Sequence, residues 1–472
     1  MKVLLLNPPA ARGVRMVREG RCMQREGAWT AVWAPITLVT MAAILEKEGF
    51  KVKVVDTIVE KIDFPGLKKI IANFQPDLIV VNTASGSIES DLSVASFAKK
   101  IDPKIKVCAF GIHVTALTED CFKLEPPLDF IIRGEPEMTT LELAKNLGKE
   151  KHLSRIKGLS WRQDSKIIHN PDRPAIADLD SLPFPAWEYV NVDNYRMPFS
   201  GKPFLLVGLG RGCPYNCLFC ADKTFYGQKL RLPSPGKVIG EIEGNLKKFK
   251  VNEFLFWTES FTLNREFALQ VCQEIIKKKL KIRFVVNSRV DHVDRQLLKE
   301  LKKAGCFMIG FGIESANKEI LAAMRKGVTV SQIKKAVRLA KEAGLEVTGH
   351  FMLGFPGETQ ASIIKTINLA CQLPFDFAQF YCTVPFPGSE LYGLALKNNW
   401  LTTRDWSRFE QNFSVLNLPG LSASKVMELR RLAFRKFYFR PKIILKTLAQ
   451  FKTPKVAIWF FKTAWNFWRW TK

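Results

Sequence analysis

The chain has 472 residues, of which 47 % are hydrophobic, a composition typical of a globular protein with room for about three domains of ~150 residues each. Seven of its ten cysteines stand singly in the sequence, which excludes a secreted disulfide framework and predicts a protein of the reducing cytoplasm. The formal charge of +26 concerns partners rather than fold, and it leaves nucleic acid, a membrane surface and anionic substrates open.

Residues 1–148 alternate short apolar runs with helical stretches. This βαβα pattern predicts a doubly wound parallel sheet of five strands. The apolar run at the N-terminus is too short for a signal peptide and is expected to be the first strand. The five expected strands are KVLLL (2–6), KVKVVD (51–56), DLIVV (77–81), KVCAF (106–110) and FIIRG (130–134).

Three further regions follow along the chain. Residues 149–200 are rich in Pro and Asp, and predict a connector with one hairpin at 158–169. Residues 201–392 alternate a second time and predict a partial (β/α)6 barrel, two units short of closure. Residues 393–472 are expected to form a helical, basic and aromatic C-terminal region. The six expected barrel strands are FLLVGLG (204–210), EFLFW (253–257), IRFVVNS (282–288), CFMIGFG (306–312), LEVTGHFML (345–353) and FAQFYCTV (377–384).

Three of the cysteines lie close together in the segment GRGCPYNCLFC. Cys213, Cys217 and Cys220 have the spacing C-x3-C-x2-C, and clustered thiolates bind soft metals. A structural zinc ion takes four protein ligands, whereas the next cysteine is Cys272 and the next histidine is His292. A four-iron cluster held by three cysteines keeps one iron open for another ligand. The spacing therefore favours a 4Fe–4S cluster over a zinc knuckle or buried structural cysteines.

The cysteine segment resembles the cluster motif of the radical S-adenosylmethionine (radical SAM) superfamily, because it follows the first strand of the expected partial barrel. In that family the open iron binds the amino and carboxylate groups of SAM. An electron then cleaves the sulfonium and releases a 5′-deoxyadenosyl radical. The resemblance covers about residues 200–395, and it implies a cluster on Cys213, Cys217 and Cys220 with SAM bound beside it.

Later strand ends resemble the branch of this superfamily that also uses cobalamin. The matching segments are FWTESFTLN (256–264), NSRVDHVD (287–294), GFGIESAN (310–317), GHFMLGFPGET (349–359) and VPFPGSELY (384–392). The resemblance implies SAM contacts from Glu259, Ser260, Asn287, Arg289, Glu314 and Ser315. Glu259 departs from the more usual Asp. Taken singly, Arg289 would form a surface ion pair in most proteins, and GFPGE would form a tight turn. A buried Glu314, by contrast, requires a partner such as a ribose or an ammonium group.

Ligands of a doubly wound sheet bind beyond the carboxyl ends of its strands. The loops expected there contain Thr83 and Ser85 in TASGS, Gly111 and His113 in GIH, and Gly134. These loops look small and open, which suits a large flat ligand. No G-x-G-x-x-G follows the first strand, which argues against a dinucleotide.

The segments FGIHVTALTED (110–120) and FIIRGEPEMTTLELAKNL (130–147) resemble the cobalamin-binding domain that precedes the barrel in this branch. The strand-end position of these loops and the resemblance together predict cobalamin contacts from Thr83, Ser85, Gly111, His113 and Gly134. The Asp-x-His-x-x-Gly loop that supplies a histidine to cobalt is absent, because NPPAARG follows the first strand, so cobalamin is expected to be base-off. His113 is as readily a hydrogen-bonded loop histidine as a cobalt ligand. Some members of the family keep this domain without cobalamin.

Residues 430–472 hold twelve Lys or Arg, no Asp or Glu, and four tryptophans from position 459 onward. No apolar run approaches the ~20 residues that a membrane-spanning helix needs. Basic residues mixed with Trp and Phe are typical of a helix lying on anionic lipid. We expect such a peripheral membrane contact in preference to a packed helical cap, and either of these in preference to nucleic-acid binding by stacking.

These patterns predict a cobalamin-dependent radical SAM enzyme that methylates an unactivated carbon of a small or lipid-like metabolite. The resemblance implies that one SAM methylates the cobalamin and another supplies the radical. The main alternative is a cyclase, oxidase or carbon–carbon coupling enzyme acting on a lipid or tetrapyrrole. A cobalamin-binding sensor is an alternative of another class, although sensing needs no open iron. The expected partners are the substrate, an electron donor such as flavodoxin or ferredoxin, and the inner face of the membrane; nucleic acid is not expected.

Overall fold

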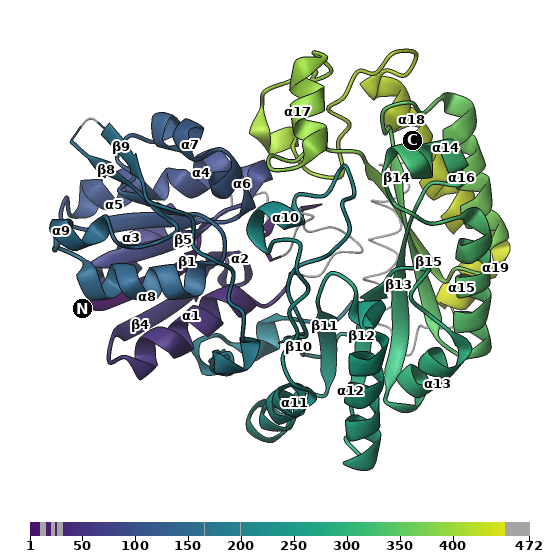
Figure 1. The fold of residues 1–472 in the computed structure, drawn as a ribbon, viewed down its shortest axis with the longest axis horizontal. Coiled ribbons are helices and arrows are strands. Elements are labelled where there is room, and N and C mark those ends of the chain that lie inside the picture. Colours follow the sequence, from purple (N-terminus) through teal and green to yellow (C-terminus); the bar gives the residue numbers. More distant parts are fainter. Residues whose placement is uncertain (10–15, 20–23, 26–31, 165, 199, 449–472) are drawn as a thin grey trace.

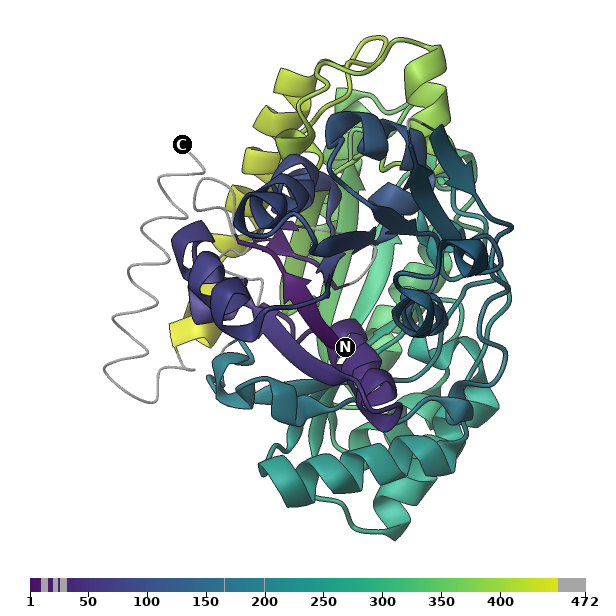
Figure 2. The same ribbon diagram turned by 90° about the vertical axis from the view of Figure 1, so that its left-hand side faces the viewer.

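The structure is a computed structural model that describes residues 1–9, 16–19, 24–25, 32–164, 166–198 and 200–448. Two α/β units lie side by side in it, each built on its own sheet (Figure 1). The short helix α10 (Asp222–Phe225) lies between them. Figure 2 faces the first unit and shows that it covers one side of the second. The α/β class expected from the sequence is confirmed.

The sheet of the first unit contains the five predicted strands, which are parallel and run in the order β4-β1-β5-β6-β7. The strand order reverses between β1 and β5, which is the switch point of a doubly wound sheet. The predicted connector hairpin is present as β8 and β9, and it pairs antiparallel with β7, so that it extends this sheet. The strands are β1 Lys2–Asn7, β4 Lys51–Asp56, β5 Leu78–Asn82, β6 Lys106–Phe110, β7 Phe130–Ile132, β8 Leu159–Gln163 and β9 Lys166–His169; β2 (Met16–Val17) and β3 (Gln24–Arg25) form a separate pair.

Both faces of this sheet are buried. Side chains alternate between the two faces of a strand, so Val3 and Leu5 of β1 enter one apolar cluster and Leu4 and Leu6 enter the other. Helices α1 and α8 cover the first face, and α3 and α5 cover the second. The helices are α1 Ile36–Lys47, α2 Thr57–Glu60, α3 Phe64–Phe74, α4 Ile88–Leu92, α5 Val94–Ile101, α6 Ile112–Ala116, α7 Thr118–Leu124, α8 Pro136–Asn146 and α9 Glu150–Leu153.

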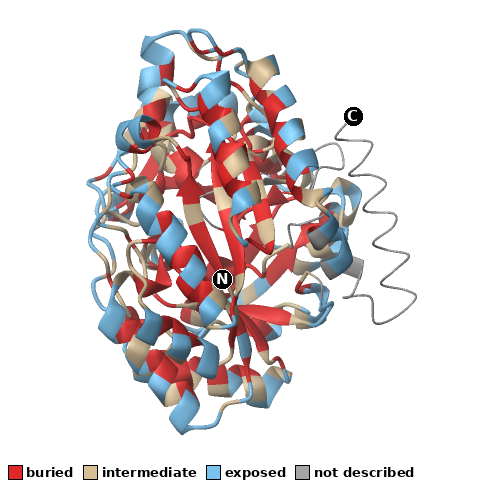
Figure 3. Cartoon of the chain, turned by 90° about the vertical axis from the view of Figure 1, so that its right-hand side faces the viewer, coloured by how far each residue is buried: buried red, intermediate tan, exposed pale blue. Residues whose placement is uncertain are grey.

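The second unit has six parallel strands in chain order, β10 to β15, and all six coincide with predicted strands. The helices between them pack on one face of the sheet, which Figure 3 shows as buried strands behind helices with exposed outer faces. The strands are β10 Phe204–Gly208, β11 Glu253–Trp257, β12 Arg283–Ser288, β13 Cys306–Glu314, β14 Glu346–Leu353 and β15 Phe377–Cys382. The helices are α11 Pro235–Phe249, α12 Arg265–Lys277, α13 Arg295–Lys303, α14 Lys318–Ala323, α15 Val330–Glu342 and α16 Gln360–Gln372.

Each of these six helices begins at a side chain that caps it. The capping oxygen accepts a hydrogen bond from a main-chain N–H in the first turn, which otherwise lacks a partner. This local chemistry decides where each helix starts after its strand. The capping residues are Ser234, Asn264, Asp294, Asn317, Thr329 and Thr359.

The two units share one continuous apolar core, and the connector lies inside it. Trp187 and Tyr195 of the connector are fully buried in the same cluster as α1 and the barrel strands. The Tyr195 hydroxyl donates to Asp56 Oδ2 at 3.0 Å, and the Ala186 N–H donates to the Val39 carbonyl at 3.1 Å. The connector is therefore packed between the units rather than a free tether.

The C-terminal region covers the last strand of the barrel. Helix α18 (Ala423–Tyr438) packs against β15, whose outer edge would otherwise present unpaired main-chain groups. Arg430 Nε donates to the Phe380 carbonyl at 2.7 Å, and the Tyr438 hydroxyl donates to the Ala378 carbonyl at 2.9 Å. Helices α17 (Glu390–Lys397) and α19 (Pro441–Leu448) flank α18. Among the described helices, none has the length and apolar run needed to cross a bilayer. The basic, Trp-rich residues 449–472 lie outside the described residues.

Candidate cofactor site

The cysteine loop between β10 and α10 is closed by main-chain hydrogen bonds. Arg211 and Arg231 exchange two of them, each 2.9 Å long, and the Cys213 N–H donates to the Gly227 carbonyl at 3.4 Å. Gly212 has a φ of +82°, and a Cβ there would lie 2.4 Å from a main-chain oxygen across the loop. That position therefore requires glycine, and the loop has one well-defined path.

The three predicted cluster ligands are half-buried on this loop. Cys213, Cys217 and Cys220 form no disulfide in the described part of the chain, and the Cys220 N–H donates to the Cys217 carbonyl at 3.0 Å. No group of three or more His, Cys, Asp or Glu among the described residues is placed to hold a single metal ion. A four-iron cluster is larger than a single ion, and three accessible thiols on one tight loop fit it.

A positive group lies beside the cysteine loop. The Arg289 guanidinium stacks on the ring of Tyr215, 3.5 Å from its centroid, and pairs with Asp291 at 2.9 Å. Tyr215, between the first two cysteines, hydrogen-bonds through its hydroxyl to His292. Burial disfavours the charged form of Arg289, but Asp291, Tyr215 and Cys217 outweigh that effect and raise its pKa. The guanidinium therefore stays charged beside the cysteine loop.

Several predicted SAM contacts lie close together at the strand ends. The Arg289 N–H donates to Ser260 Oγ at 3.2 Å, next to the half-buried Glu259. Arg289 Nη2 donates to the Lys326 carbonyl at 2.7 Å, and Lys326 Nζ pairs with Glu314 Oε1 at 2.7 Å. The partner that buried Glu314 requires is thus Lys326. Carboxylates can bind the amino group of SAM and cations can bind its carboxylate, so side chains of both kinds close together fit the amino-acid end of SAM.

The structure brings Asn287 but not Ser315 to the open face of the barrel sheet. The Ser315 side chain is fully buried and hydrogen-bonds to helix α16. A Cβ on Gly310 would lie 2.6 Å from Asn287 Oδ1 and 2.9 Å from His350 Nε2, so these two side chains meet over the glycine. His350 Nδ1 lies 3.3 Å from the Tyr381 hydroxyl. A polar row therefore crosses the sheet on the face opposite its helices.

In the first unit, the predicted loop residues form two contacting pairs. A Cβ on Gly111, whose φ is +136°, would lie 2.7 Å from Thr83 Oγ1, and Ser85 Oγ lies 3.1 Å from His113 Nδ1. The His113 ring packs edge-on against Trp406, with centroids 4.5 Å apart. Burial lowers the pKa of His113 to about 3, so its imidazole is neutral at physiological pH.

The loops with Ser85 and His113 are covered, not open as their composition suggested. One apolar cluster closes the strand ends of both sheets, because the C-terminal region folds back across them. The sequence does not indicate this contact, because the C-terminal region and the loops that it covers are far apart in the chain. The members of this interface cluster are Met16, Ala84, Ile112, Ala221, Val384, Phe386, Phe409 and Val415.

Polar atoms beside the interface cluster fit a ligand rich in amides. Arg18 Nη1, Thr383 Oγ1 and Gln411 Oε1 are buried without a hydrogen-bond partner among the described residues. Each stands within two residues of a cluster member. Buried polar atoms are normally paired, so they offer donors and acceptors to a bound molecule. The corrin ring of cobalamin carries amides around its edge, and these residues therefore fit it.

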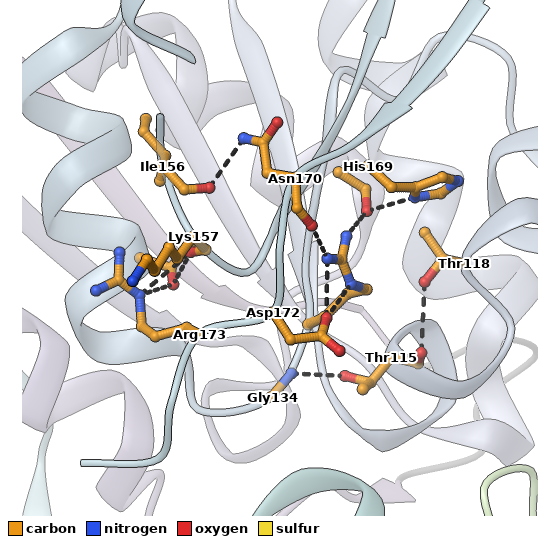
Figure 4. Close-up of polar contacts among 12 residues, drawn as sticks. Thr115, Thr118, Gly134, Ile156, Lys157, His169, Asn170, Asp172 and Arg173 are labelled. Carbon is orange, nitrogen blue, oxygen red and sulfur yellow. Dashed lines mark hydrogen bonds and ion pairs between the residues drawn. The ribbon is translucent and has the colours of Figure 1, made fainter. Parts of the chain in front are cut away.

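The Gly134 loop touches the cysteine segment. The Gly134 N–H donates to Thr115 Oγ1 at 3.1 Å (Figure 4). The preceding residue, Arg133, pairs with Asp172 at 2.9 Å. On the other side, a Cβ on Gly134 would lie 3.8 Å from the Phe225 carbonyl oxygen in α10. The loop predicted for cobalamin and the loop predicted for the cluster are therefore neighbours.

Some residues at these sites were not singled out from the sequence. Glu137 and Arg211 stand inside the segments that carry the resemblance, but their pairing joins distant parts of the chain. Tyr381 and His350 alternate with apolar residues on their strands, a pattern that indicates an open face without indicating chemistry. Lys326 follows a helix in the segment MRKG and carries no local signal.

Two family models match the chain. The Radical SAM superfamily model matches residues 207–370, and the B12 binding domain model matches residues 29–144. The first range begins in β10 and ends in α16, and the second covers most of the first unit. Fold and site together define an enzyme that joins a radical SAM barrel to a cobalamin-binding domain.

Known proteins share this architecture over most of the chain. An uncharacterized methyltransferase of Pyrococcus horikoshii is 33 % identical over 448 residues, 95 % of each chain. The anaerobic magnesium-protoporphyrin IX monomethyl ester cyclase of Cereibacter sphaeroides is 27 % identical over 416 residues, 86 % of this chain and 67 % of the cyclase. The structure of OxsB, a cobalamin-dependent SAM radical enzyme, with aqua-cobalamin and SAM bound has a TM-score of 0.73 at 16 % identity, covering 98 % of this chain and 70 % of its own. That of the methyltransferase TsrM from Kitasatospora setae, with cobalamin and a 4Fe–4S cluster bound, has a TM-score of 0.71 at 17 % identity, covering 93 % and 89 %.

The chain therefore belongs to the radical SAM superfamily, in the branch that carries a cobalamin-binding domain. It is a radical SAM enzyme, and its cofactors are a 4Fe–4S cluster, SAM and cobalamin.

Replacing Cys213, Cys217 and Cys220 together by Ala is expected to abolish iron–sulfur loading and SAM cleavage. The loop then has no thiolate for iron, so 5′-deoxyadenosine formation should fall by at least about a hundredfold, a loss that matches removal of the electron source. Iron and sulfide content and 5′-deoxyadenosine yield measure this after anaerobic reconstitution. The matched control is Cys272→Ala, a buried cysteine on α12, which should keep both. A triple variant that still makes 5′-deoxyadenosine contradicts the ligand assignment.

His113→Gln is expected to weaken the pH dependence of stability. The pKa of His113 is lowered to about 3 in the folded state, so between pH 6.5 and 3 the unfolded chain binds more protons and stability falls as pH falls. For this one group the free energy of unfolding should drop by about 2 kcal/mol between pH 7.5 and 5. Urea unfolding of both proteins at the two pH values isolates that difference. Equal losses in the wild type and the variant would refute it.

Proposed function

We propose that this enzyme methylates an unactivated carbon of a small or lipid-like metabolite. The observation that carries the proposal is the contact between the Gly134 loop and the helix that follows the cysteine loop, where Gly134 lies against Phe225 and α6 packs against α10. A radical source and a methyl carrier that share one interface can act in turn on one substrate carbon. The methyltransferase relative of Pyrococcus horikoshii, which matches 95 % of this chain, supports the same activity.

If bound at this interface, the cluster would supply the electron that cleaves SAM, and cobalamin would carry the methyl group. Within the chain, Cys213, Cys217 and Cys220 would hold the cluster. Glu259, Ser260, Arg289 and Glu314 would bind and orient the amino-acid end of SAM, and Asn287 would contact it from the open face of the sheet. In the first unit, Thr83, Ser85, Gly111, His113 and Gly134 would shape the cobalamin loops. Ser315 would act only through helix α16, to which its hydroxyl is bonded.

The polar row on the open face of the barrel sheet would orient the substrate. Gly310 leaves room above β13, with Asn287 and His350 on either side. His350 and Tyr381 can each donate or accept a hydrogen bond, so they can hold a polar group of an otherwise apolar substrate. The interface cluster, with Phe386 and Phe409, would exclude water from the radical.

A radical cyclisation, oxidation or carbon–carbon coupling without methyl transfer is the second candidate. The similarity to the magnesium-protoporphyrin IX monomethyl ester cyclase over 86 % of this chain favours it. That candidate would act on a lipid or a tetrapyrrole. A cobalamin-binding sensor is disfavoured, because sensing does not require the accessible cysteine loop.

The proposed division of the chain follows these roles. Residues 1–148 form the cobalamin-binding unit, 149–200 the connector, 201–392 the barrel and 393–472 the C-terminal region. The hairpin β8–β9 belongs to the connector by sequence and to the first sheet by pairing.

We further propose that the enzyme works in the cytoplasm, takes its electron from a flavodoxin or ferredoxin, and contacts the inner face of the membrane through its C-terminus. Next to the tail, Phe439, Ile444 and Leu445 are 48 %, 41 % and 66 % exposed. Exposed apolar side chains beside a strongly basic segment suit an anionic lipid surface. A lipid-like substrate would then be within reach of the enzyme.

The methyl-transfer proposal predicts two uses of SAM for each product. The reconstituted enzyme, given a lipid and metabolite extract and methyl-labelled SAM, should release S-adenosylhomocysteine and 5′-deoxyadenosine in similar amounts and place the label in the product. Mass spectrometry of the extract and both SAM products measures this, with the triple cysteine variant as control. A new product without label, formed by protein that holds cobalamin, would instead establish the second candidate.

The membrane proposal predicts that truncation after residue 448 releases the protein from anionic liposomes. This variant keeps α19, whose Ile443 packs in the core, so the described fold should remain. Binding of the full chain should weaken with salt, because exposed charges are screened beyond ~8 Å at physiological ionic strength. Flotation with anionic and neutral liposomes tests both points. Full-length protein that stays unbound from anionic liposomes at low salt excludes the contact.

A further inference from the structure

Four charged side chains meet where the first unit joins the barrel. Glu135 and Glu137, at the start of α8, face Arg211 of the cysteine loop and Arg231, which follows α10. The pairs Arg211–Glu137 and Arg231–Glu135 are each 2.5 Å apart, and Arg211 also lies 3.5 Å from Glu135. The two carboxylates and Arg231 are at most 6 % exposed. Two positive and two negative charges thus balance in a buried site, and we refer to these four residues as the junction ion pairs.

The same side chains also bind the connector between the units. Glu135 Oε2 accepts from the Ile176 N–H at 2.9 Å, and Arg231 Nη1 donates to the Ile176 carbonyl at 2.7 Å. Glu135 of the first unit and Arg231 of the second therefore bind the main-chain N–H and the carbonyl of the same connector residue, Ile176. Three segments of the chain are fixed at this point.

From Arg231 and Arg211 the contacts lead directly to the cluster ligands. The two arginines exchange main-chain hydrogen bonds, and Arg211 stands two residues before Cys213. Arg231 Nη2 donates to the Tyr226 carbonyl at 2.7 Å, and the next residue, Gly227, accepts from the Cys213 N–H. Any shift of these arginines would move the cysteine loop.

From the two glutamates the contacts lead directly to the proposed cobalamin loop. Glu135 follows Gly134, which bonds to Thr115 at the end of α6 and lies against Phe225 of α10. The junction ion pairs therefore join the residue after Gly134 to the arginine two residues before Cys213.

We propose that the junction ion pairs position the cobalamin loop relative to the cluster loop. Glu135, Glu137, Arg211 and Arg231 are then positioning residues for a reaction in which both cofactors act on one substrate carbon. The shared apolar core holds the units together but is not directional. Buried, hydrogen-bonded ion pairs with defined geometry select one arrangement of the units. This inference rests on the proposed function, because methyl transfer is the reason why the cobalamin loop and the cluster loop must keep a fixed relative position.

The test measures the distance between the two cofactors. In the reconstituted enzyme, the reduced 4Fe–4S cluster and cobalt(II) cobalamin are both paramagnetic, and pulsed EPR reports their dipolar coupling. Glu137→Gln removes one charge without changing side-chain size, and Arg231→Lys keeps the charge but loses the bonds to Ile176 and Tyr226. The matched control is Asp376→Asn, which breaks the Lys341–Asp376 pair of 2.8 Å inside the barrel unit.

Both junction variants are expected to weaken and spread the coupling, while each cofactor keeps its own EPR spectrum. Product formed per 5′-deoxyadenosine should fall by roughly tenfold, because displacements near 1 Å can cost ~10²-fold in group transfer. The Asp376→Asn enzyme should keep the wild-type coupling and product ratio. If Glu137→Gln does not fold, Arg231→Lys carries the test.

Unchanged coupling in a folded junction variant would overturn the inference, even if that variant were less stable. Wild-type protein that shows the coupling but transfers no methyl label would overturn the proposed methylation and leave the positioning intact. Wild-type protein that takes up no cobalamin would overturn both, since the junction would then have no second cofactor to place.

Discussion

Parallel strands all end at the same edge of their sheet, and in this protein the carboxyl ends of the parallel strands of two sheets meet at one interface. The loops after β5, β6 and β7 come from one sheet, and those after β10 and β15 from the other. Ligand-binding loops of α/β folds gather at such edges. The meeting of the two edges therefore brings two sets of loops into a single site, and the arrangement of the remaining elements follows from keeping them there.

Two kinds of interaction hold the edges together. The interface cluster and the shared core contribute by removing apolar surface from water, with about 1.5–3 kcal/mol for each large side chain such as Phe386 or Phe409. This force tolerates small displacements. The ion pairs between Glu137 and Arg211 and between Glu135 and Arg231 do not, because their geometry is directional and their charges are buried. The apolar surfaces thus hold the two units together, and the ion pairs fix how the units are positioned relative to each other.

The C-terminal region completes both the sheet and the site. Helix α18 satisfies the outer edge of β15 through Arg430 and Tyr438, which protects an edge strand from unwanted pairing. The segment before α18 places Trp406 on His113 and Phe409 in the interface cluster. The same region therefore covers the edge of the barrel and packs apolar side chains against the loops with Ser85 and His113.

The sequence by itself determined the local features of this protein. Short apolar runs between helical stretches predicted the five parallel strands of the first unit and all six strands of the barrel, and the hairpin was predicted in the connector, because these patterns depend on neighbours in the chain. The C-x3-C-x2-C spacing indicated the cluster loop for the same reason. Only the tertiary structure decided that the hairpin joins the first sheet, that the loops with Ser85 and His113 are covered, and that Lys326 is the partner of Glu314. Likewise, the pairing of Glu135 and Glu137 with Arg231 and Arg211 depends on where two units dock. Contacts of this kind join residues far apart in the chain, and no periodicity or spacing encodes them; they follow from which surfaces pack together once each unit has folded.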